Sequence, residues 1–332
     1  DGRRARRSGP NEGGVVTTNT ARTRGAKGGG TAGTTTRGGT KAPSISKDLR
    51  TALLFIGPAA VGFTAFYLIP TINGFYYSLT KFNLLGTPKF TGLDNFVALF
   101  QDKLFYNALG VTVVYVLLNI GFQTVLAVGL AVLMQRLTSS TVLRGMLLLP
   151  WLISNVIAAM LWFWLLDYQV GLINNFLDFL GANRIPFFGG EFWAIPTIAF
   201  VNVWRHMGYT ALLVFAGLQA IPTYVYEAAA IDGSSEWNSF WRITLPLLRP
   251  VMALVLVMTV TGSFQIFDTV AVTTKGGPVN ASRVLQYYIY EKGFAQGQFG
   301  YASALSVILF LILAAFAVLQ MRLLRAGDSD LA

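Results

Sequence analysis

The stretch ASALSVILFLILAAFAVLQMRLL occupies residues 302–324 and contains no charged side chain before Arg322. At about 1.5 Å of rise per residue, a helix of this length crosses the roughly 30 Å of hydrocarbon in a bilayer. Because lipid offers no hydrogen-bond partner to backbone groups, an apolar segment inside a membrane must pair them within a helix. The stretch therefore predicts a transmembrane helix.

Five further apolar stretches have the length of a membrane span, at residues 52–79, 108–134, 142–166, 193–217 and 248–270. The chain of 332 residues is 54% hydrophobic and 12% charged, whereas soluble domains carry roughly 25% charged residues. These features predict an all-α integral membrane protein with six transmembrane helices. Of the connections, residues 172–180 predict a short amphipathic helix at the membrane interface, and residues 88–105 predict a short structured loop.

Basic residues are concentrated at the N-terminal end. Residues 1–50 hold 11 of the 25 Lys and Arg residues and three acidic residues, whereas the rest of the chain holds 14 basic and 12 acidic residues. Such a Gly-, Thr- and Arg-rich segment has too little apolar surface to fold. We expect a disordered, basic cytoplasmic tail at residues 1–48, the six-helix domain at residues 49–326, and a short C-terminal tail at residues 327–332.

The distribution of charge also predicts the orientation and argues against one class of partner. With six spans, the tail, the connection that carries Arg136 and Arg144, and the C-terminal Arg322 and Arg325 lie on one side. The positive-inside rule places that side in the cytoplasm, which gives an N-in, C-in topology. A basic tail without aromatic residues beside a membrane domain is typical of this topology rather than of nucleic-acid binding.

Composition disfavours reactive sites. The sequence has no cysteine and a single histidine, His206, which excludes thiol nucleophiles and thiolate metal sites and disfavours His-based ones. Gly33 to Gly38 has the glycine spacing of a phosphate loop, but Gly39 stands where the required lysine would be. We therefore expect no catalytic residue, metal site or cofactor in this chain.

Residues 222–246, with the sequence PTYVYEAAAIDGSSEWNSFWRITLP, form the most informative connection. They predict two short helices separated at Gly233, which supplies a positive φ, with Pro246 ending the second helix. Helical spacing gathers three aromatic residues on one face of the second helix, namely Trp237, Phe240 and Trp241. Such a face either docks into a groove on a partner protein or packs back on the chain's own membrane helices.

This connection resembles the EAA loop of binding-protein-dependent ABC permeases, through Glu227-Ala228-Ala229, Asp232-Gly233, Ile243 and Leu245-Pro246. Other segments resemble the maltose-type carbohydrate-uptake branch of that family, at residues 92–96, 264–268, 274–278 and 299–306. One departure is Lys275, which stands where that branch usually has glycine. The resemblance implies a type I ABC importer permease fold. It also implies that the loop forms coupling helices that dock on an ATPase subunit, and the candidate coupling residues are Glu227, Ala228, Ala229, Asp232, Gly233, Trp237, Phe240, Leu245 and Pro246.

The same resemblance implies the partners. The chain would pair with a second, homologous permease subunit and with an ABC ATPase dimer that binds the ATP and magnesium. A solute-binding protein outside the cytoplasm would deliver the substrate, a sugar or related solute. The expected location is the bacterial cell (plasma) membrane, which the chain would cross several times.

Polar side chains on two spans are candidates for the substrate path. On the fourth span they share one face, and on the fifth span they recur at helical spacing. Their amide, carboxylate and guanidinium groups suit sugar hydroxyls, and nearby tryptophans could stack on a sugar ring; the alternative is that they hold helices together or lie at the membrane interface. The candidates are Asn202, Arg205, His206, Tyr209, Thr261, Gln265 and Asp268, with Trp162, Trp164 and Trp204 for stacking. Arg205 would either meet an anionic group or pair with Asp268.

Two other functions compete with a primary-transport subunit. A secondary transporter would favour carboxylates inside the membrane and inverted repeats, but among the polar candidates only Asp268 is acidic. A membrane enzyme would need a nucleophile–base pair or a metal cluster, and neither pattern is visible. Within the leading class, disaccharides, oligosaccharides, amino sugars and glycerol phosphate diesters remain open as cargo.

Overall fold

A computed structural model describes residues 45–83, 86–137 and 140–323. Most of the predicted N-terminal tail (1–48) and all of the predicted C-terminal tail (327–332) lie outside these ranges. Contacts divide the chain into residues 1–58 and residues 59–332. The first described element, α1 (Ile45–Phe63), begins inside the segment predicted as the tail. The last four residues of that predicted tail, 45–48, are therefore helical.

The first predicted span is helical throughout. α1 continues through a π-helical turn (Thr64–Leu68) into α2 (Ile69–Ser78). The π-turn lies directly before Pro70, and its hydrogen bond runs from the backbone N–H of Ile69 to the carbonyl of Thr64. A proline lacks an N–H, and its ring collides with the carbonyl four residues earlier, so a wider turn accommodates it within the helix.

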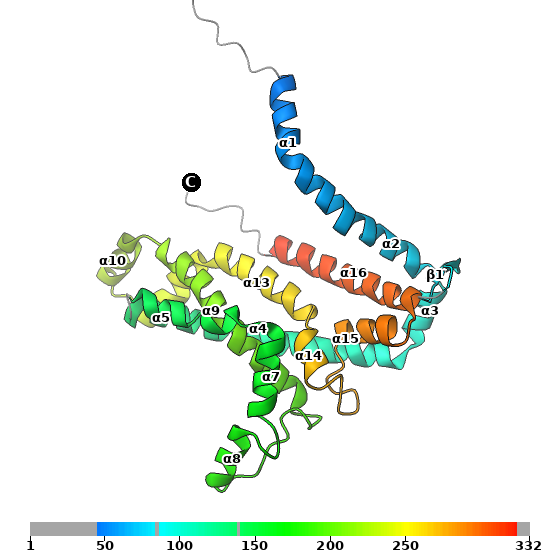
Figure 1. Cartoon of the computed structure of the whole chain (residues 1–332). Coiled ribbons are helices and arrows are strands. Elements are labelled where there is room, and N and C mark those ends of the chain that lie inside the picture. The colour runs from blue at the N-terminus through cyan, green and yellow to red at the C-terminus, as the bar shows by residue number, and fades with distance from the viewer. Residues whose placement is uncertain (1–44, 84–85, 138–139, 324–332) are drawn as a thin grey trace, which may run out of the picture. The chain divides into compact units, whose positions relative to one another are not determined.

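Four helical segments are long and apolar enough to cross a membrane by length and composition, at residues 52–78, 103–136, 249–272 and 299–322 of the described chain. They contain α2, α4 (Lys103–Leu137), α13 (Arg249–Phe264), α14 (Asp268–Val272) and α16 (Phe299–Leu323) (Figure 1). Two bent helix pairs bring the number to six if each pair is one span. The bends fall in the predicted third span and after the predicted fourth span.

The predicted third span, residues 142–166, is broken. It consists of α5 (Thr141–Met146), α6 (Leu149–Leu152) and α7 (Asn155–Leu165). The α5–α6 segment meets α7 at 90°. The fourth span, α9 (Ala194–Gln219), is a continuous helix that packs along α4.

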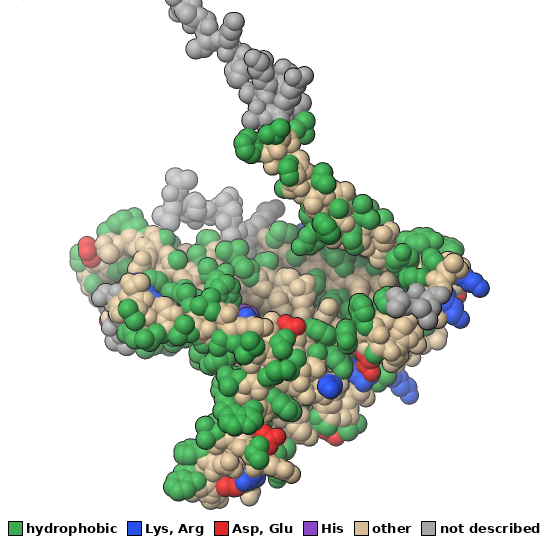
Figure 2. All heavy atoms as spheres, in the orientation of Figure 1, with side chains coloured by type: hydrophobic (Ala, Val, Ile, Leu, Met, Phe, Trp, Pro, Cys, Tyr) green, Lys and Arg blue, Asp and Glu red, His purple; other side chains and the backbone are tan. Residues whose placement is uncertain are grey.

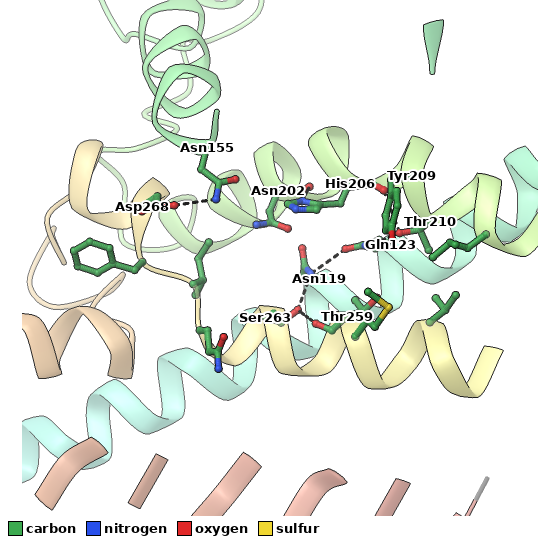
Figure 3. Close-up of a pocket in the computed structure, with 17 residues that line it drawn as sticks. Asn119, Gln123, Asn155, Asn202, His206, Tyr209, Thr210, Thr259, Ser263 and Asp268 are labelled. Carbon is green, nitrogen blue, oxygen red and sulfur yellow. Dashed lines mark hydrogen bonds between the residues drawn. The ribbon is translucent and has the colours of Figure 1, made fainter. Parts of the chain in front are cut away.

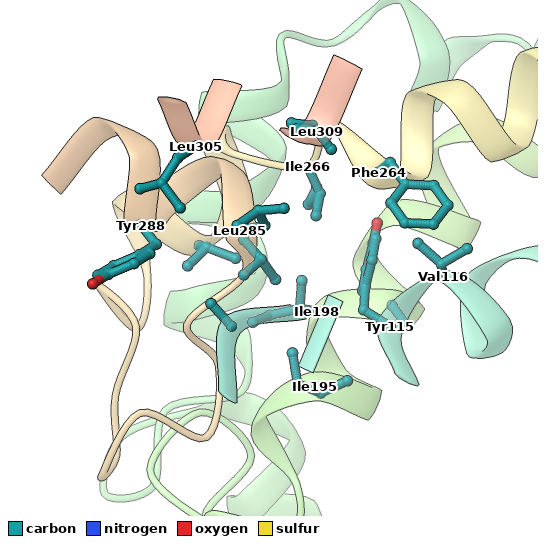
Figure 4. Packing of buried hydrophobic residues seen from close by; sticks show 14 of the residues in the cluster. Tyr115, Val116, Ile195, Ile198, Phe264, Ile266, Leu285, Tyr288, Leu305 and Leu309 are labelled. Carbon is teal, nitrogen blue, oxygen red and sulfur yellow. The ribbon is translucent and has the colours of Figure 1, made fainter. Parts of the chain in front are cut away.

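Buried apolar side chains form two clusters. The larger joins α4, α9, α13 and α16 with α15 (Leu285–Tyr290), and Tyr115, Ile198, Phe264 and Leu305 are fully or almost fully buried in it (Figure 4). The smaller cluster is rich in small residues where α4 crosses α9, among them Ala127, Ala131 and Ala211. Small side chains let membrane helices approach closely, so this contact sets the spacing of the two helices.

The remaining connections hold short elements. β1 (Thr80–Lys81) and β2 (Lys89–Phe90) pair antiparallel with Thr80 opposite Phe90, so the all-α prediction missed one small hairpin. It is followed by α3 (Asp94–Gln101). The helix predicted at residues 172–180 is confirmed as α8 (Leu172–Phe179). Figure 2 shows hydrophobic side chains over most of the visible surface and few charged ones among them, as expected for a surface that faces lipid.

Candidate functional site

A polar cavity of about 310 Å³ lies among the apolar helices (Figure 3). α4, α9 and α13 supply most of its wall, and the start of α7 and the break between α13 and α14 complete it. Its polar lining residues are Asn119, Gln123, Asn155, Asn202, His206, Tyr209, Thr210, Thr259, Ser263, Gln265 and Asp268. Polar residues inside membrane helices are costly when they face lipid, and here they face a shared hollow.

The cavity brings together part of the predicted substrate path. Asn202, His206 and Tyr209 on α9 line it, as do Gln265 and Asp268 at the α13–α14 break. The candidates that do not line it are Thr261, Arg205, Trp204, Trp162 and Trp164. The i, i+4, i+7 stripe that included Thr261 assumed an unbroken helix, but α13 ends at Phe264 and α14 begins only at Asp268.

Residues on α4 that the sequence analysis missed form the centre of the cavity. The Asn119 amide donates to the Ser263 hydroxyl (2.8 Å) and to the Gln123 side-chain carbonyl (3.2 Å). The Gln123 amide donates to the Thr210 hydroxyl (2.9 Å), which links α4 to α9. Two amides at i, i+4 inside an otherwise apolar helix were the signal that could have found them.

Asp268 joins the predicted fifth span to the predicted third span. Its carboxylate accepts a hydrogen bond of 2.8 Å from the Asn155 amide, so the first residue of α14 meets the first residue of α7 (Figure 3). Among the described residues, Asp268 forms no ion pair with Arg205. The pairing that the sequence left open is therefore replaced by a carboxylate–amide contact.

Arg205 instead stabilises the break in the third span. Its guanidinium donates to the backbone carbonyls of Ile153 (2.8 Å) and Trp151 (3.1 Å), and contacts Nε2 of His206 (2.9 Å). These carbonyls lie where helical hydrogen bonding stops between α6 and α7, so the arginine satisfies groups that would otherwise be unpaired in the membrane. Arg205 thus has a structural role in this chain.

The aromatic candidates pack against one another and not in the cavity. Trp162 lies edge-on to Trp204 and to Phe200, with ring centroids 5.4 and 4.8 Å apart. Tyr209, which does line the cavity, stacks on Trp151 with centroids 4.8 Å apart. A tryptophan role in sugar stacking at this cavity is therefore not supported by the arrangement of Trp162 and Trp204.

The second candidate site is the connection at residues 222–246. α10 (Thr223–Ile231) ends before Gly233, whose φ of +74° is the predicted left-handed position. α11 (Glu236–Ser239) follows, with the Ser235 hydroxyl accepting from the N–H of Asn238. The bend between α9 and α10 is 70°.

One expectation for this connection was wrong. Pro246 does not end the second helix, because a π-turn (Phe240–Thr244) leads into α12 (Leu245–Leu247) and on to α13. The turn's hydrogen bond from the N–H of Leu245 to the carbonyl of Phe240 accommodates the proline as the π-turn before Pro70 does. Residues 236–264 are therefore helical almost without interruption.

The predicted coupling residues lie largely on an exposed surface. Glu227, Ala228, Asp232, Gly233 and Trp237 are exposed, Phe240, Leu245 and Pro246 are half-buried, and Ala229 is buried. Trp237 is 71% exposed, and the adjacent Trp241 is 50% exposed. Two of the three aromatic residues, Trp237 and Trp241, thus face away from the chain's own helices, whereas Phe240 is half-buried. The exposed pair favours docking into a groove on a partner protein.

Polar contacts hold the helical hairpin at residues 222–246, hereafter the hairpin, to the helices behind it. Arg136, at the end of α4, forms an exposed ion pair with Glu236 at 2.6 Å. The hydroxyls of Tyr226 on α10 and Thr244 in the π-turn hydrogen-bond at 3.1 Å. The two halves of the hairpin are thereby tied to each other and to α4.

A third polar cluster lies at the other ends of the helices. The Asp102 carboxylate accepts hydrogen bonds from the hydroxyls of Tyr288 and Tyr301, the latter at 2.7 Å, and from the N–H of Leu104 at 2.8 Å. Burial opposes ionisation of Asp102, but these hydrogen bonds and the nearby charge of Lys292 hold its pKa below its ordinary value. Burial and the same contact with Asp102 raise the pKa of Tyr288.

The chain matches the family described as binding-protein-dependent transport system inner membrane component over residues 123–326. The chain belongs to this family. The matched range includes the hairpin at residues 222–246 and most of the cavity, so both sites lie in the part that defines the family. It is a permease of the inner membrane that crosses the bilayer several times.

This permease is also similar to named permeases of other organisms. It is 34% identical to the probable ABC transporter permease protein YurN of Bacillus subtilis, over 83% of this chain and 97% of YurN. It is 30% identical to the trehalose/maltose transport system permease protein MalF of Thermococcus litoralis, over 83% and 94%. The fold resembles that of a bacterial ABC transporter involved in import of the acidic polysaccharide alginate, with a TM-score of 0.74 and 24% identity over 86% of this chain and 99% of that one.

Proposed function

We propose that this permease is the membrane-spanning subunit of an ATP-driven ABC importer in a bacterial plasma membrane, and that its cargo is a sugar. The proposed topology has six spans with both termini in the cytoplasm, and each bent helix pair counts as one span. Residues 1–48 and 327–332 would be cytoplasmic tails flanking the permease domain. The proposal makes the chain a conduit without a catalytic site, like its named permease relatives.

The observation that carries the proposal is that a polar cavity and an exposed hairpin lie along one nearly continuous helical path. Ser263, which lines the cavity, belongs to α13. The same helical path begins at Glu236 in the hairpin. A force applied to the hairpin therefore reaches the cavity wall through a helix, which is what a transporter driven by an external motor requires.

The hairpin offers the surface for that motor. An aromatic face exposed to water is unfavourable in isolation, and helices commonly bury such faces in a groove on a partner. We propose that the partner is an ABC ATPase dimer that binds ATP and magnesium, with Glu227, Gly233 and Trp237 among the contact residues. No nucleotide or metal is assigned to this chain.

Two further partners complete the proposed importer. A second, similar permease would complete the path, as in the ABC permease family to which the chain belongs. A solute-binding protein would deliver the cargo, and one structure of similar fold was solved in complex with an alginate pentasaccharide-bound periplasmic protein. The names of the relatives include a neutral sugar (trehalose/maltose) and anionic solutes (sulfoquinovosyl glycerol and sn-glycerol-3-phosphate). Sequence similarity therefore does not decide whether the cargo is neutral or charged.

The test is uptake by the reconstituted complex in vesicles. Gln265→Ala combined with Asp268→Ala should abolish uptake while leaving assembly and ATPase docking intact, because both side chains line the cavity and neither lies in the hairpin. Thr261→Ala is the matched control, since this neighbour on α13 does not line the cavity. Unchanged uptake in the double variant would remove the cavity from the substrate path, and uptake that needs no ATPase would contradict the whole proposal.

A further inference from the structure

We infer that the part of the path supplied by this chain favours neutral or cationic saccharides over anionic ones, with Asp268 as the residue that determines this preference. The inference rests on the proposed function, because it concerns the cargo of the same cavity. It depends on which of the charged groups near the cavity face the space inside it.

Within the described part of the chain, one acidic residue lines the cavity, and it is Asp268. One of its carboxylate oxygens accepts the Asn155 amide. The contact partner is neutral, so it orients the carboxylate without cancelling its charge. Asp268 is half-buried at the wall and Gln265 beside it is exposed, so the carboxylate is in reach of a solute in the cavity.

Arg205 is the basic residue whose charge acts on Asp268. Arg205 is not part of the lining, and all three of its guanidinium nitrogens have partners: two carbonyls at the α6–α7 break and the His206 ring. Those carbonyls include the C-terminal end of α6, the negative end of a helix dipole. Arg205 thus does not line the cavity, so its positive charge acts on a solute only from behind the wall, where it also acts on Asp268.

His206 adds no positive charge to the lining. Its Nδ1 lies 3.0 Å from the backbone carbonyl of Asn202, which can only accept, so Nδ1 carries a hydrogen. Its Nε2 lies 2.9 Å from Nη1 of Arg205, which can only donate, so Nε2 must be the unprotonated acceptor. Both contacts are satisfied by the neutral ring, and a protonated ring would place an N–H against the guanidinium.

The remaining polar groups of the lining are uncharged amides and hydroxyls, which recognise sugar hydroxyls without regard to charge. A carboxylate strengthens hydrogen bonds from hydroxyl or ammonium groups and repels phosphate, sulfonate or uronate groups. The geometry therefore points to a neutral sugar or an amino sugar as the cargo.

Because the chain has no native cysteine, the electrostatic effect of Asp268 inside the cavity can be tested directly with an introduced thiol. A thiol introduced as Gln265→Cys in the full importer complex is labelled with two thiosulfonate reagents of similar size, one bearing a trimethylammonium group and one a sulfonate. With rates normalised to a free small thiol, we expect the cationic reagent to react about tenfold faster, as a carboxylate at close range would cause. Adding Asp268→Asn should bring the ratio close to one, because the amide keeps an acceptor for Asn155 and removes the charge.

Equal rates, faster reaction of the anionic reagent, or a thiol inert to both would overturn the inference. Uptake of trehalose, glucosamine, glucuronate and glycerol 3-phosphate is then compared in vesicles that contain the complex and its binding protein. Glucuronate or glycerol 3-phosphate taken up as fast as the best neutral or cationic solute would also overturn it. If the complex hydrolysed ATP but took up no saccharide from a larger set of sugars, the proposed function would be wrong. The ratio of labelling rates measured at Gln265→Cys would still stand.

Discussion

A β-carbon built on Gly208 would lie 1.8 Å from the backbone carbonyl oxygen of Leu147, so α9 passes the α5–α6 segment at a distance that no side chain allows. This contact seats the broken third span against the helix that lines the cavity. Together with the hydrogen bonds from Arg205, it fixes the break where α7 turns away.

Gly208→Ala should therefore separate α9 from the α5–α6 segment. Overpacking of this kind costs about 1–3 kcal/mol, and we expect a lower melting temperature of the purified permease and reduced uptake. Gly110→Ala on α4 is the control, because a β-carbon there meets no atom within 4 Å. Equal melting temperatures for the two variants would show that the close approach is not needed.

Gly233→Val should uncouple transport from ATP hydrolysis. The position has a φ of +74°, and a β-branched residue there costs about 1–2 kcal/mol or shifts the hairpin. The space around it is open, so backbone strain and not a collision is the cause. Gly233→Asn should behave nearly as the parent, since asparagine tolerates this conformation. Full ATP-dependent uptake by the valine variant would contradict the coupling role.

The ion pair between Arg136 and Glu236 should transmit motion more than it adds stability. Both side chains are largely exposed, so reversing either charge should leave thermal stability nearly unchanged. We expect Arg136→Glu and Glu236→Arg each to lower the uptake obtained per ATP hydrolysed, and the double exchange to restore it. A double variant as poorly coupled as the single ones would mean that the pair is incidental.

Asp102→Asn should loosen the cluster that joins the start of α4 to α15 and α16. Loss of a charged acceptor for two tyrosine hydroxyls typically costs about 1–3 kcal/mol. Because the pKa of Asp102 is lowered in the folded protein, its contribution is present at neutral pH and is lost only as the pH falls below the ordinary value of 3.8. The stability difference from the parent should thus be constant from about pH 5 to 8. Asp94→Asn, on the exposed side of α3, is the control.

Lys275→Gly should stabilise the connection after α14. The lysine has a φ of +50°, a conformation that glycine adopts without strain. We expect the free energy of unfolding to rise by about 1 kcal/mol from the relief of strain. The greater conformational freedom of glycine in the unfolded chain offsets part of this increase. A raised melting temperature would support this, whereas a lowered one would indicate that the lysine side chain makes a stabilising contact.

The spans were predictable from sequence because membrane crossing depends on apolar length, which the first, second, fifth and sixth stretches display directly. The breaks were not. Nothing in the local sequence of residues 142–166 reveals that Arg205, about fifty positions later, satisfies the carbonyls at Ile153. Likewise, a proline such as Pro246 normally ends a helix, and the π-turn that absorbs it depends on how the neighbouring turns pack.

The same reasoning explains why only some of the predicted path residues line the cavity. Gln265 and Asp268 were found because charged and amide groups stand out near the end of an apolar stretch. Asn119 and Gln123 were not predicted because the polar candidates were confined to the fourth and fifth spans, whereas three helices form most of the cavity wall. Arg205 was assigned to the path since sequence does not distinguish a side chain that faces a cavity from one that caps a broken helix.

The nearly unbroken helical course from Glu236 to Phe264 carries a mechanical implication. It runs from the hairpin, through a turn at Leu248, to Ser263 and Gln265 at the cavity. If the helix had ended at Pro246, a movement of the hairpin could have been lost in a flexible connection at that point. Because the widened turn carries the helix past Pro246, the coupling proposed above would pass a tilt of the hairpin along the helix to the cavity wall.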